Sequence, residues 1–332
     1  MTLHQTAPPA PSPTFDGDPF AGLSLADRAR IEAAMTASHT ESTRRVYRNA
    51  WRAWERWCTT RSITTLPASP TAICAYLTER AATGASVGTL DNACSAISYE
   101  HRCLGLVDPV RHEGVRLVRR GLRRTLGTAP RRLARPLTVE EIGRIVASID
   151  RTTPIGARDA AVILIGYASA LRRSELVALT LADVGHRPGG LLLTIRRSKT
   201  DTEGRGQVVG VAHGRHPDTD PVAALSSWMI ARGGESGPVF TRCPHGVPTA
   251  EPIVGETVSR MLRDRAAAAG LDPVRITGHS LRAGHATAAA LAGVSLDRIA
   301  AQTRHKRLST LLNHYIRPAQ MLDVTSSRDL GL

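Results

Sequence analysis

The sequence has few aromatic residues and no long apolar run, and each shortage narrows the kind of protein it can be. Phe, Trp and Tyr make up only 4% of the 332 residues, so the core must consist mainly of Ala, Leu, Val and Ile. No stretch approaches the roughly 18 uninterrupted apolar residues of a transmembrane helix. Residues 1–13 lack a basic stretch followed by an apolar one, which argues against a secretory signal. We therefore expect a cytoplasmic protein without a membrane partner.

Motifs for disulfides, metals and nucleotides are also missing. The five cysteines are odd in number and include no CxxC pair, so we expect neither a disulfide framework nor a structural zinc site. Cys243 and His245 lie close together, but two ligands are too few for zinc. The absence of a GxxxxGKS/T loop and of a GxSxG elbow argues against an NTPase and a serine hydrolase. We expect no metal and no cofactor.

Positive charge, by contrast, is abundant. The chain has 43 basic and 29 acidic residues, for a formal net charge of +14, which favours a polyanion such as nucleic acid as partner. Lys199 and Lys306 are the only lysines, a bias that a GC-rich genome explains. A lysine kept against this bias is a candidate for a role closed to arginine, because only lysine can release its proton near neutral pH.

Residues 42–58 predict an amphipathic helix with two stripes. The stripe expected to face the core consists of Tyr47, Trp51, Trp54 and Cys58. The second stripe is basic and consists of Arg45, Arg48, Arg52 and Arg56. Four cations without matched acids repel one another, so we weigh a DNA-backbone role for this stripe equally with plain solvation.

A second basic run lies between residues 101 and 135, with ten arginines against two acids. A solvated arm and a phosphate-binding surface both fit such a run, and we favour the phosphate-binding surface. A helix predicted over residues 113–126 carries the candidate DNA-binding side chains of this run, namely Arg119, Arg120, Arg123 and Arg124.

Periodicity and turn residues predict how the chain is organised. We expect a disordered tail (1–22), a helical domain (23–126), a basic linker (127–136) and a second domain (137–332). In the second domain, a capping box of Thr138 and Glu141 begins a helix, and residues 191–195 and 207–211 predict a β-hairpin. Other helices are expected over residues 71–80, 86–104, 157–169, 173–178, 221–231, 254–270, 280–292, 296–302 and 308–315. The fold class is thus mainly α with a small hairpin or sheet.

Three short patterns in the second domain bring together side chains suited to phosphate chemistry. They are ALRRSEL at 170–176, HSLR at 279–282, and RH at 304–305 followed by an apolar helix. With the hairpin lysine, the candidate residues are Arg172, Glu175, Lys199, His279, Arg282, His305 and Tyr315. Arginine matches two phosphate oxygens, histidine can position or move a proton, and tyrosine can be a covalent nucleophile. The set indicates phosphoryl transfer without a metal.

This arrangement resembles the tyrosine recombinase (phage integrase) family. Residues 42–124 look like its all-α, SAM-like core-binding domain, and residues from 137 onward look like its mixed α/β catalytic domain. The resemblance matches Arg172 and Arg282 to the catalytic arginines, Glu175 to the acid that supports the first of them, Lys199 to the hairpin lysine, His279 to the histidine of the HxxR pair, His305 to the later histidine and Tyr315 to the nucleophile.

Two positions depart from the family pattern. The family usually has glycine before the later histidine, where this chain has Arg304. Its tyrosine usually follows that histidine by nine positions, whereas Tyr315 follows His305 by ten and His314 stands at the ninth. A wider turn, an altered geometry and a decayed site are all compatible with an extra residue. Because the other catalytic positions are filled, we expect a working enzyme.

The resemblance implies a site-specific, integrase-like recombinase that cuts and rejoins DNA through a 3′-phosphotyrosyl intermediate. Such an enzyme integrates, excises or resolves a mobile element or chromosome. The expected partner is double-stranded DNA, bound by a homotetramer of protomers that are monomers when free. Residues 316–332 would dock on a neighbouring protomer, and accessory DNA-bending or directionality proteins are further candidate partners.

Two alternatives stay open on the sequence. A type IB topoisomerase shares the tyrosine and arginine chemistry but relaxes supercoils as a monomer. A catalytically silent DNA-binding protein would keep the clamp and lack the reaction, and the unusual position of Tyr315 favours this second alternative.

Overall fold

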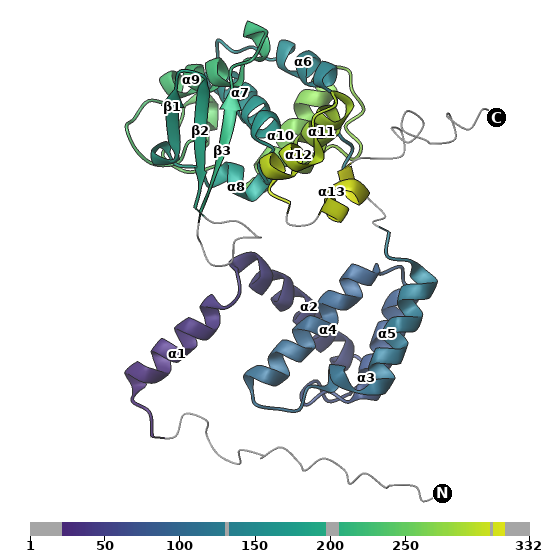
Figure 1. The fold of residues 1–332 in the computed structure, drawn as a ribbon. Coiled ribbons are helices and arrows are strands. Elements are labelled where there is room, and N and C mark those ends of the chain that lie inside the picture. The colour runs from purple at the N-terminus through teal and green to yellow at the C-terminus, as the bar shows by residue number, and fades with distance from the viewer. Residues whose placement is uncertain (1–21, 130–132, 197–205, 306–307, 316–332) are drawn as a thin grey trace, which may run out of the picture. The chain divides into compact units, whose positions relative to one another are not determined.

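A computed structural model describes residues 22–129, 133–196, 206–305 and 308–315. The chain divides into two compact units, residues 1–131 and 132–332, which are described one at a time (Figure 1). The tails expected over residues 1–22 and 316–332 lie outside the described residues, apart from Gly22. Within the described ranges, no helix is both long and apolar enough to cross a membrane.

The N-terminal unit is built from helices whose starts are set by hydroxyl caps. The side chains of Thr40, Ser69 and Ser86 accept hydrogen bonds from the first turns of three of these helices, as N-cap residues do. The elements are α1 (Leu25–Ala37), α2 (Glu41–Thr59), α3 (Pro70–Ala82), α4 (Val87–Cys103), the short 3-10 turn η1 (Pro109–Arg111) and α5 (Glu113–Leu126). The described part of this unit is all-α, as the sequence predicts.

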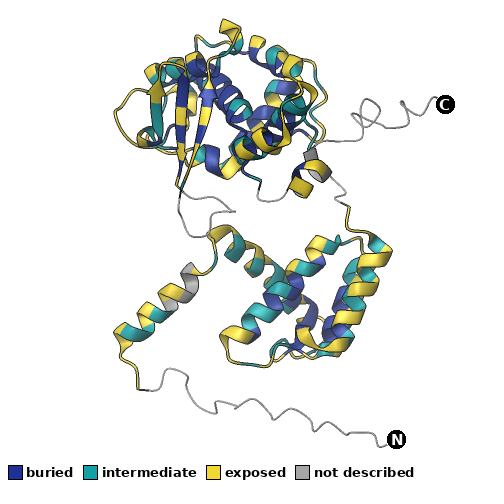
Figure 2. Ribbon diagram, viewed as in Figure 1, coloured by how far each residue is buried: buried dark blue, intermediate teal, exposed yellow. Residues whose placement is uncertain are grey.

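An aromatic cluster forms the centre of this unit. The ring of Trp54 stacks on that of Trp57 at a centroid distance of 5.4 Å, and both meet the edge of Tyr76 at 5.2 and 5.3 Å. Of the stripe predicted on α2, Trp54 and Cys58 are fully buried. Tyr47 and Trp51 are only partly buried, and the ring of Tyr47 lies 5.6 Å from that of Tyr99 in α4. The core therefore centres on the C-terminal half of α2 (Figure 2).

The C-terminal unit surrounds one buried helix, α7 (Pro154–Ser169). This helix packs against α9 and α11 and is buried along most of its length (Figure 2). The other helices are α6 (Val139–Ala147), α8 (Arg173–Val177), α9 (Pro221–Arg232), α10 (Gly255–Ala268), α11 (Gly278–Leu291), α12 (Leu296–Thr303) and α13 (Leu308–Tyr315), with 3-10 turns at Leu181–Asp183, Pro217–Thr219 and Pro244–Gly246. The capping box of Thr138 and Glu141 is present at the start of α6.

A three-stranded antiparallel sheet covers one side of this unit. Its order is β1 (Val184–Arg187), β2 (Gly190–Ile195) and β3 (Gln207–Ala212), with Leu193 opposite Val184 on one side and Val209 on the other. Alternate residues of β2 and β3 face the core, which is why the sequence predicts this hairpin. The sequence did not predict β1, and residues 197–205, between the two predicted strands, lie outside the described residues.

The approach of α11 to the start of the unit requires a glycine. A Cβ built on Gly284 would lie 2.2 Å from the Leu137 carbonyl oxygen and 2.8 Å from the Tyr167 ring. A backbone oxygen cannot move aside as a side chain can, so this glycine fixes how closely α11 packs. The N-terminal end of α11 bears His279 and Arg282 and is positioned by this contact.

Candidate active site

The turn between α7 and α8 places Arg172 beside a buried carboxylate. Ala170 ends α7 in the left-handed conformation, with φ 50°, and the chain then extends through Arg172, the N-cap of α8. The Glu175 carboxylate accepts one hydrogen bond from the Arg172 backbone N–H and one from its Nη1, both at 2.8 Å. The Glu175 side chain is 2% exposed, whereas that of Arg172 is 19% exposed. Glu175 therefore orients a guanidinium that still reaches solvent.

Arg282 is almost completely buried and ties two turns together. Its Nη1 donates to the Ala170 carbonyl at 2.6 Å, and its Nη2 donates to the Thr303 carbonyl. Ala170 precedes Arg172, and Thr303 precedes His305 by two residues. Both turns contain a left-handed residue other than glycine, a conformation that costs about 1–2 kcal/mol. One guanidinium thus holds in place the two turns that carry the other site residues.

His305 lies in the second of these turns as a neutral imidazole. Its Nε2 is 3.3 Å from Arg282 Nη2, and its Nδ1 is 2.7 Å from Thr303 Oγ1. A guanidinium can only donate, so Nε2 accepts and Nδ1 carries the hydrogen. Burial lowers the pKa of His305 to about 4, assisted by the positive charges of Arg282, Arg172, His279 and Arg304.

These contacts bring together five of the residues singled out in the sequence. His279, the second residue of α11, is exposed and close enough to His305 to influence its pKa. It thus joins the buried Arg282, the half-buried His305 and the Arg172–Glu175 pair. Among the described residues, no group of three or more His, Cys, Asp or Glu side chains could hold a metal ion.

The remaining two candidates lie at or beyond the limits of the described structure. Lys199 belongs to residues 197–205, which are outside the described ranges. Tyr315 is the last residue of α13, and its side chain is likewise outside the description. The helix α13 packs against α11 and α12, the helices that lead to Arg282 and His305. The backbone therefore brings Tyr315 to the same group of helices.

Arg304 is a site residue that the sequence reasoning did not assign. It ends α12 in the left-handed conformation, with φ 56° and ψ 46°. Its Nη2 forms an ion pair with the second oxygen of Glu175, and the two side chains are 4% and 2% exposed. The sequence does show that an arginine stands where a glycine is usual in the family. It does not show the partner of this arginine, because Glu175 lies 129 residues away in the chain.

The candidate DNA-binding arginines of the N-terminal unit are mostly exposed. Arg45, Arg48, Arg52 and Arg56 follow the outer side of α2, and Arg120, Arg123 and Arg124 lie exposed on α5. Asp91 of α4 binds Arg119 at 2.9 Å and Arg123 at 2.7 Å, so part of this charge is balanced within the unit. Arg45, Arg52, Arg56, Arg120 and Arg124 make no ion pair with any other described residue.

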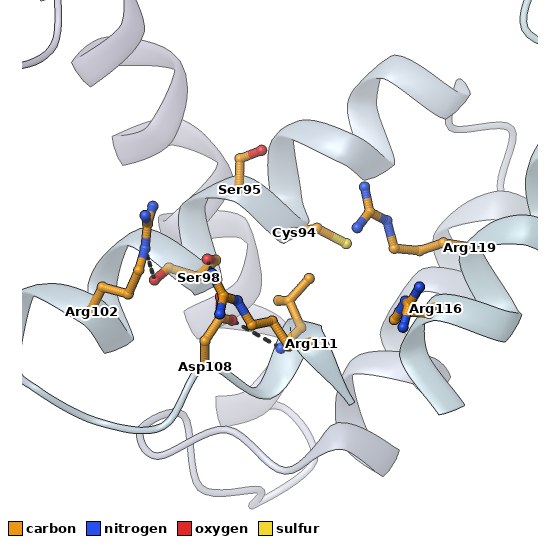
Figure 3. Close-up of a pocket in the computed structure, with 9 residues that line it drawn as sticks. Cys94, Ser95, Ser98, Arg102, Asp108, Arg111, Arg116 and Arg119 are labelled. Carbon is orange, nitrogen blue, oxygen red and sulfur yellow. Dashed lines mark hydrogen bonds and ion pairs between the residues drawn. The ribbon is translucent and has the colours of Figure 1, made fainter. Parts of the chain in front are cut away.

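A basic pocket of about 560 Å³ opens between α4, η1 and α5 of this unit (Figure 3). Arg116 and Arg119 line it from α5, Arg111 from η1 and Arg102 from α4, and Asp108 is its only acidic lining residue. Arg111 is 3.7 Å from Asp108 and is 84% exposed, so this pair leaves its charge largely available. Of these four, only Arg119 is among the candidate DNA-binding residues predicted from the sequence, although Arg102, Arg111 and Arg116 belong to the same basic run.

Comparison with known proteins finds integrases and recombinases, both by family model and by sequence similarity. The model of the phage integrase family matches residues 135–321. An integrase/recombinase described as a xerD homolog, from Selenomonas ruminantium, is 31% identical over 300 residues, which cover 89% of this chain and 85% of that protein. The recombinase cre of Escherichia phage P1 is 26% identical over 337 residues, covering 96% of this chain and 94% of cre.

Solved structures agree at the level of the fold. A crystal structure of a lambda integrase tetramer bound to a Holliday junction matches with a TM-score of 0.58. The match covers 88% of this chain and 78% of the lambda integrase chain at 18% identity, so it shows a shared fold.

Proposed function

Because this chain belongs to the phage integrase family, we propose that it is a site-specific recombinase that cuts and rejoins DNA through a 3′-phosphotyrosyl bond. The observation that carries the proposal is the meeting of Arg172, His279, Arg282 and His305 at one place in the C-terminal unit. Two guanidiniums and two imidazoles that converge in this way suit a phosphodiester, whose charge grows in the transition state.

The cutting step assigns one role to each side chain. The Tyr315 oxygen attacks the phosphorus, and the bond from phosphorus to the 5′-oxygen breaks. His279 accepts the tyrosine proton, and Lys199 gives a proton to the departing 5′-oxygen. Arg172 and Arg282 neutralise the non-bridging oxygens, and Glu175 holds Arg172 in place. Rejoining reverses these transfers with a different 5′-hydroxyl, so the step needs neither ATP nor a metal.

His305 can donate a hydrogen bond to the phosphate once Nε2 gains a proton, because in the DNA-free protein its single N–H, on Nδ1, faces Thr303 Oγ1. Burial lowers the pKa of His305 in the DNA-free protein, and the neighbouring charges of Arg282 and Arg172 lower it further. A bound phosphate adds negative charge at this place and raises that pKa again. His305 therefore becomes a better donor to the phosphate when DNA is present.

DNA contacts in the N-terminal unit come from the exposed arginines of α2 and α5 and from the basic pocket beside Asp108. Arginine side chains at these places reach backbone phosphates without reading bases. We propose that four copies assemble on DNA, as lambda integrase does on a Holliday junction. The docking of residues 316–332, the accessory proteins and the cytoplasmic location stay predictions.

Covalent capture on DNA tests this proposal. Nicked duplexes from the flanks of the gene trap the phosphotyrosyl adduct, because the short 5′-ended strand diffuses away. The wild type is compared with Tyr315→Phe and, as a matched control, His314→Phe. We expect SDS-resistant adducts at one discrete site with the wild type and His314→Phe, and none with Tyr315→Phe.

Each other outcome removes a specific part of the proposal. Adducts that persist in Tyr315→Phe and vanish in His314→Phe would move the nucleophile to the ninth position after His305. Binding without any adduct would favour the silent DNA-binding protein. Relaxation of supercoiled plasmid by monomers, with no exchange between duplexes, would favour the topoisomerase.

A further inference from the structure

Arg304 occupies a position that would suit a glycine in two respects. Its left-handed backbone is free of steric cost only for glycine, since a Cβ approaches the following carbonyl. Its guanidinium is also taken out of water, which is unfavourable for a charge unless close partners replace the solvent. A side chain that is kept under both conditions is expected to make a specific contact.

That contact is with Glu175, and it completes the surroundings of the carboxylate. Oε1 of Glu175 accepts from Arg172 Nη1, whereas Oε2 accepts from the Arg172 backbone N–H and from Arg304 Nη2. The other side-chain bond of Arg304 that involves described residues is a long one, 3.4 Å from Nη1 to the Gln302 carbonyl. Each carboxylate oxygen thus has a guanidinium partner, and the carboxylate cannot rotate without breaking an ion pair.

We propose that Arg304 is a positioning residue: its guanidinium immobilises Glu175, and Glu175 in turn holds Arg172 in the orientation that meets the phosphate. The proposal deepens the proposed function and rests on it. With glycine at this position, as is usual in the family, Oε2 would lose its guanidinium partner and depend on the Arg172 backbone N–H. The arginine therefore ties the His305 turn to the Arg172 turn a second time, independently of Arg282.

The same unit contains a matched control for this arrangement. Asp159 is also a buried acid between two guanidiniums, bonded to Arg158 at 2.7 Å and to Arg265 at 2.8 Å. Arg158 lies near the start of α7, about 18 Å of helix away from Ala170. Arg158→Ala removes one of two guanidiniums from a buried acid, as Arg304→Gly does, but far from the site.

The test compares Arg304→Gly, Arg304→Lys and Arg158→Ala with the wild type and Tyr315→Phe. Adduct formation is timed in a single turnover at saturating DNA, on the duplex found by covalent capture. We expect Arg304→Gly to slow this step roughly 10- to 100-fold, the usual effect of a misplaced catalytic group, with DNA affinity nearly unchanged. Arg304→Lys recovers part of the rate, and Arg158→Ala lowers the melting temperature without slowing the step.

A second measurement uses the DNA-free protein and so is independent of the target site. The imidazole of His305 is titrated by NMR in the wild type and in Arg304→Gly. Burial is the main cause of the lowered pKa of His305 and Arg304 is the last of the neighbouring charges that add to it, so loss of Arg304 raises this pKa slightly above about 4. Arg158→Ala leaves this titration unchanged.

A wild-type rate of adduct formation in Arg304→Gly would overturn the inference, whatever the His305 titration shows. So would a rate that falls only in proportion to the folded fraction and is not recovered by lysine, because Arg304 would then be a structural residue alone. A wild type that forms no more adduct than Tyr315→Phe overturns the proposed function itself, and this inference with it. An active wild type with an equally active Arg304→Gly overturns the inference alone.

Discussion

The arginines on α2 and α5 differ from Arg282 and Arg304 of the candidate active site in what surrounds them. In the N-terminal unit they lie exposed on α2 and α5, where most have only solvent or one acid nearby. At the candidate active site, Arg282 is 1% exposed and the side chain of Arg304 is 4% exposed, and each donates to groups on another element. Arginine therefore supplies exposed charge on α2 and α5, and Arg282 and Arg304 act as fixed donors in the candidate active site.

This contrast predicts that lysine can replace arginine on α2 and α5 but cannot replace the buried arginines of the candidate active site. An exposed guanidinium attracts phosphate mainly through its charge, which lysine supplies equally well. A buried guanidinium contributes the directions of its N–H groups, which an ammonium cannot reproduce. Exchanges of arginine and lysine that conserve charge therefore separate the two roles.

The largest effect is expected for Lys199→Arg. This substitution keeps the positive charge, but a guanidinium cannot release a proton to the departing oxygen as an ammonium can. A general acid typically contributes roughly 10²- to 10⁴-fold, so adduct formation on unmodified DNA should slow by that order. A duplex with sulfur in place of the bridging 5′-oxygen needs no such proton and should restore the rate. Full activity of the variant on unmodified DNA would show that Lys199 is not the acid.

Arg282→Lys comes next, because an ammonium cannot reach the Ala170 and Thr303 carbonyls with the same geometry. Leaving one buried carbonyl without a partner costs about 1–3 kcal/mol of unfolding free energy. Loss of a donor beside the phosphate should slow adduct formation roughly 10²- to 10³-fold. Chemical denaturation and single-turnover capture measure the two effects, and an unchanged free energy of unfolding would contradict the role of Arg282 in joining the turns.

A smaller effect concerns the dependence of stability on pH. The pKa of His305 is lowered to about 4 in the folded protein from 6.5, so between these values the unfolded chain binds more protons. This contribution to stability is complete above pH 6.5 and is lost as the pH falls towards 4. We expect the melting temperature of His305→Asn to fall less steeply over this range than that of the wild type. Parallel curves would show that His305 keeps an ordinary pKa.

The comparison also shows what could be predicted from the sequence. The bounds of α5 and α13 and the capping box of Thr138 follow from local periodicity and residue chemistry, and the structure confirms them. The sequence did not predict the strand β1, because its four residues are all partly or fully exposed and do not alternate between buried and exposed positions. The partners of Arg304 and Arg282 could not be predicted, because Glu175 lies 129 residues from Arg304 and Ala170 lies 112 residues from Arg282. Contacts at such separations depend on tertiary packing.

The smallest effect is expected on α2, and it completes the comparison. Replacing Arg45, Arg52 and Arg56 together by lysine keeps three exposed charges, so DNA affinity should stay close to that of the wild type. Replacing the same three by glutamine should weaken binding. It should also flatten the dependence of log affinity on log salt concentration by about 0.9 for each phosphate that the protein no longer neutralises. Salt titrations of binding to the captured duplex measure both. If the lysine variant binds as weakly as the glutamine variant, then the α2 arginines bind phosphate through directional hydrogen bonds, and the distinction between the two units fails.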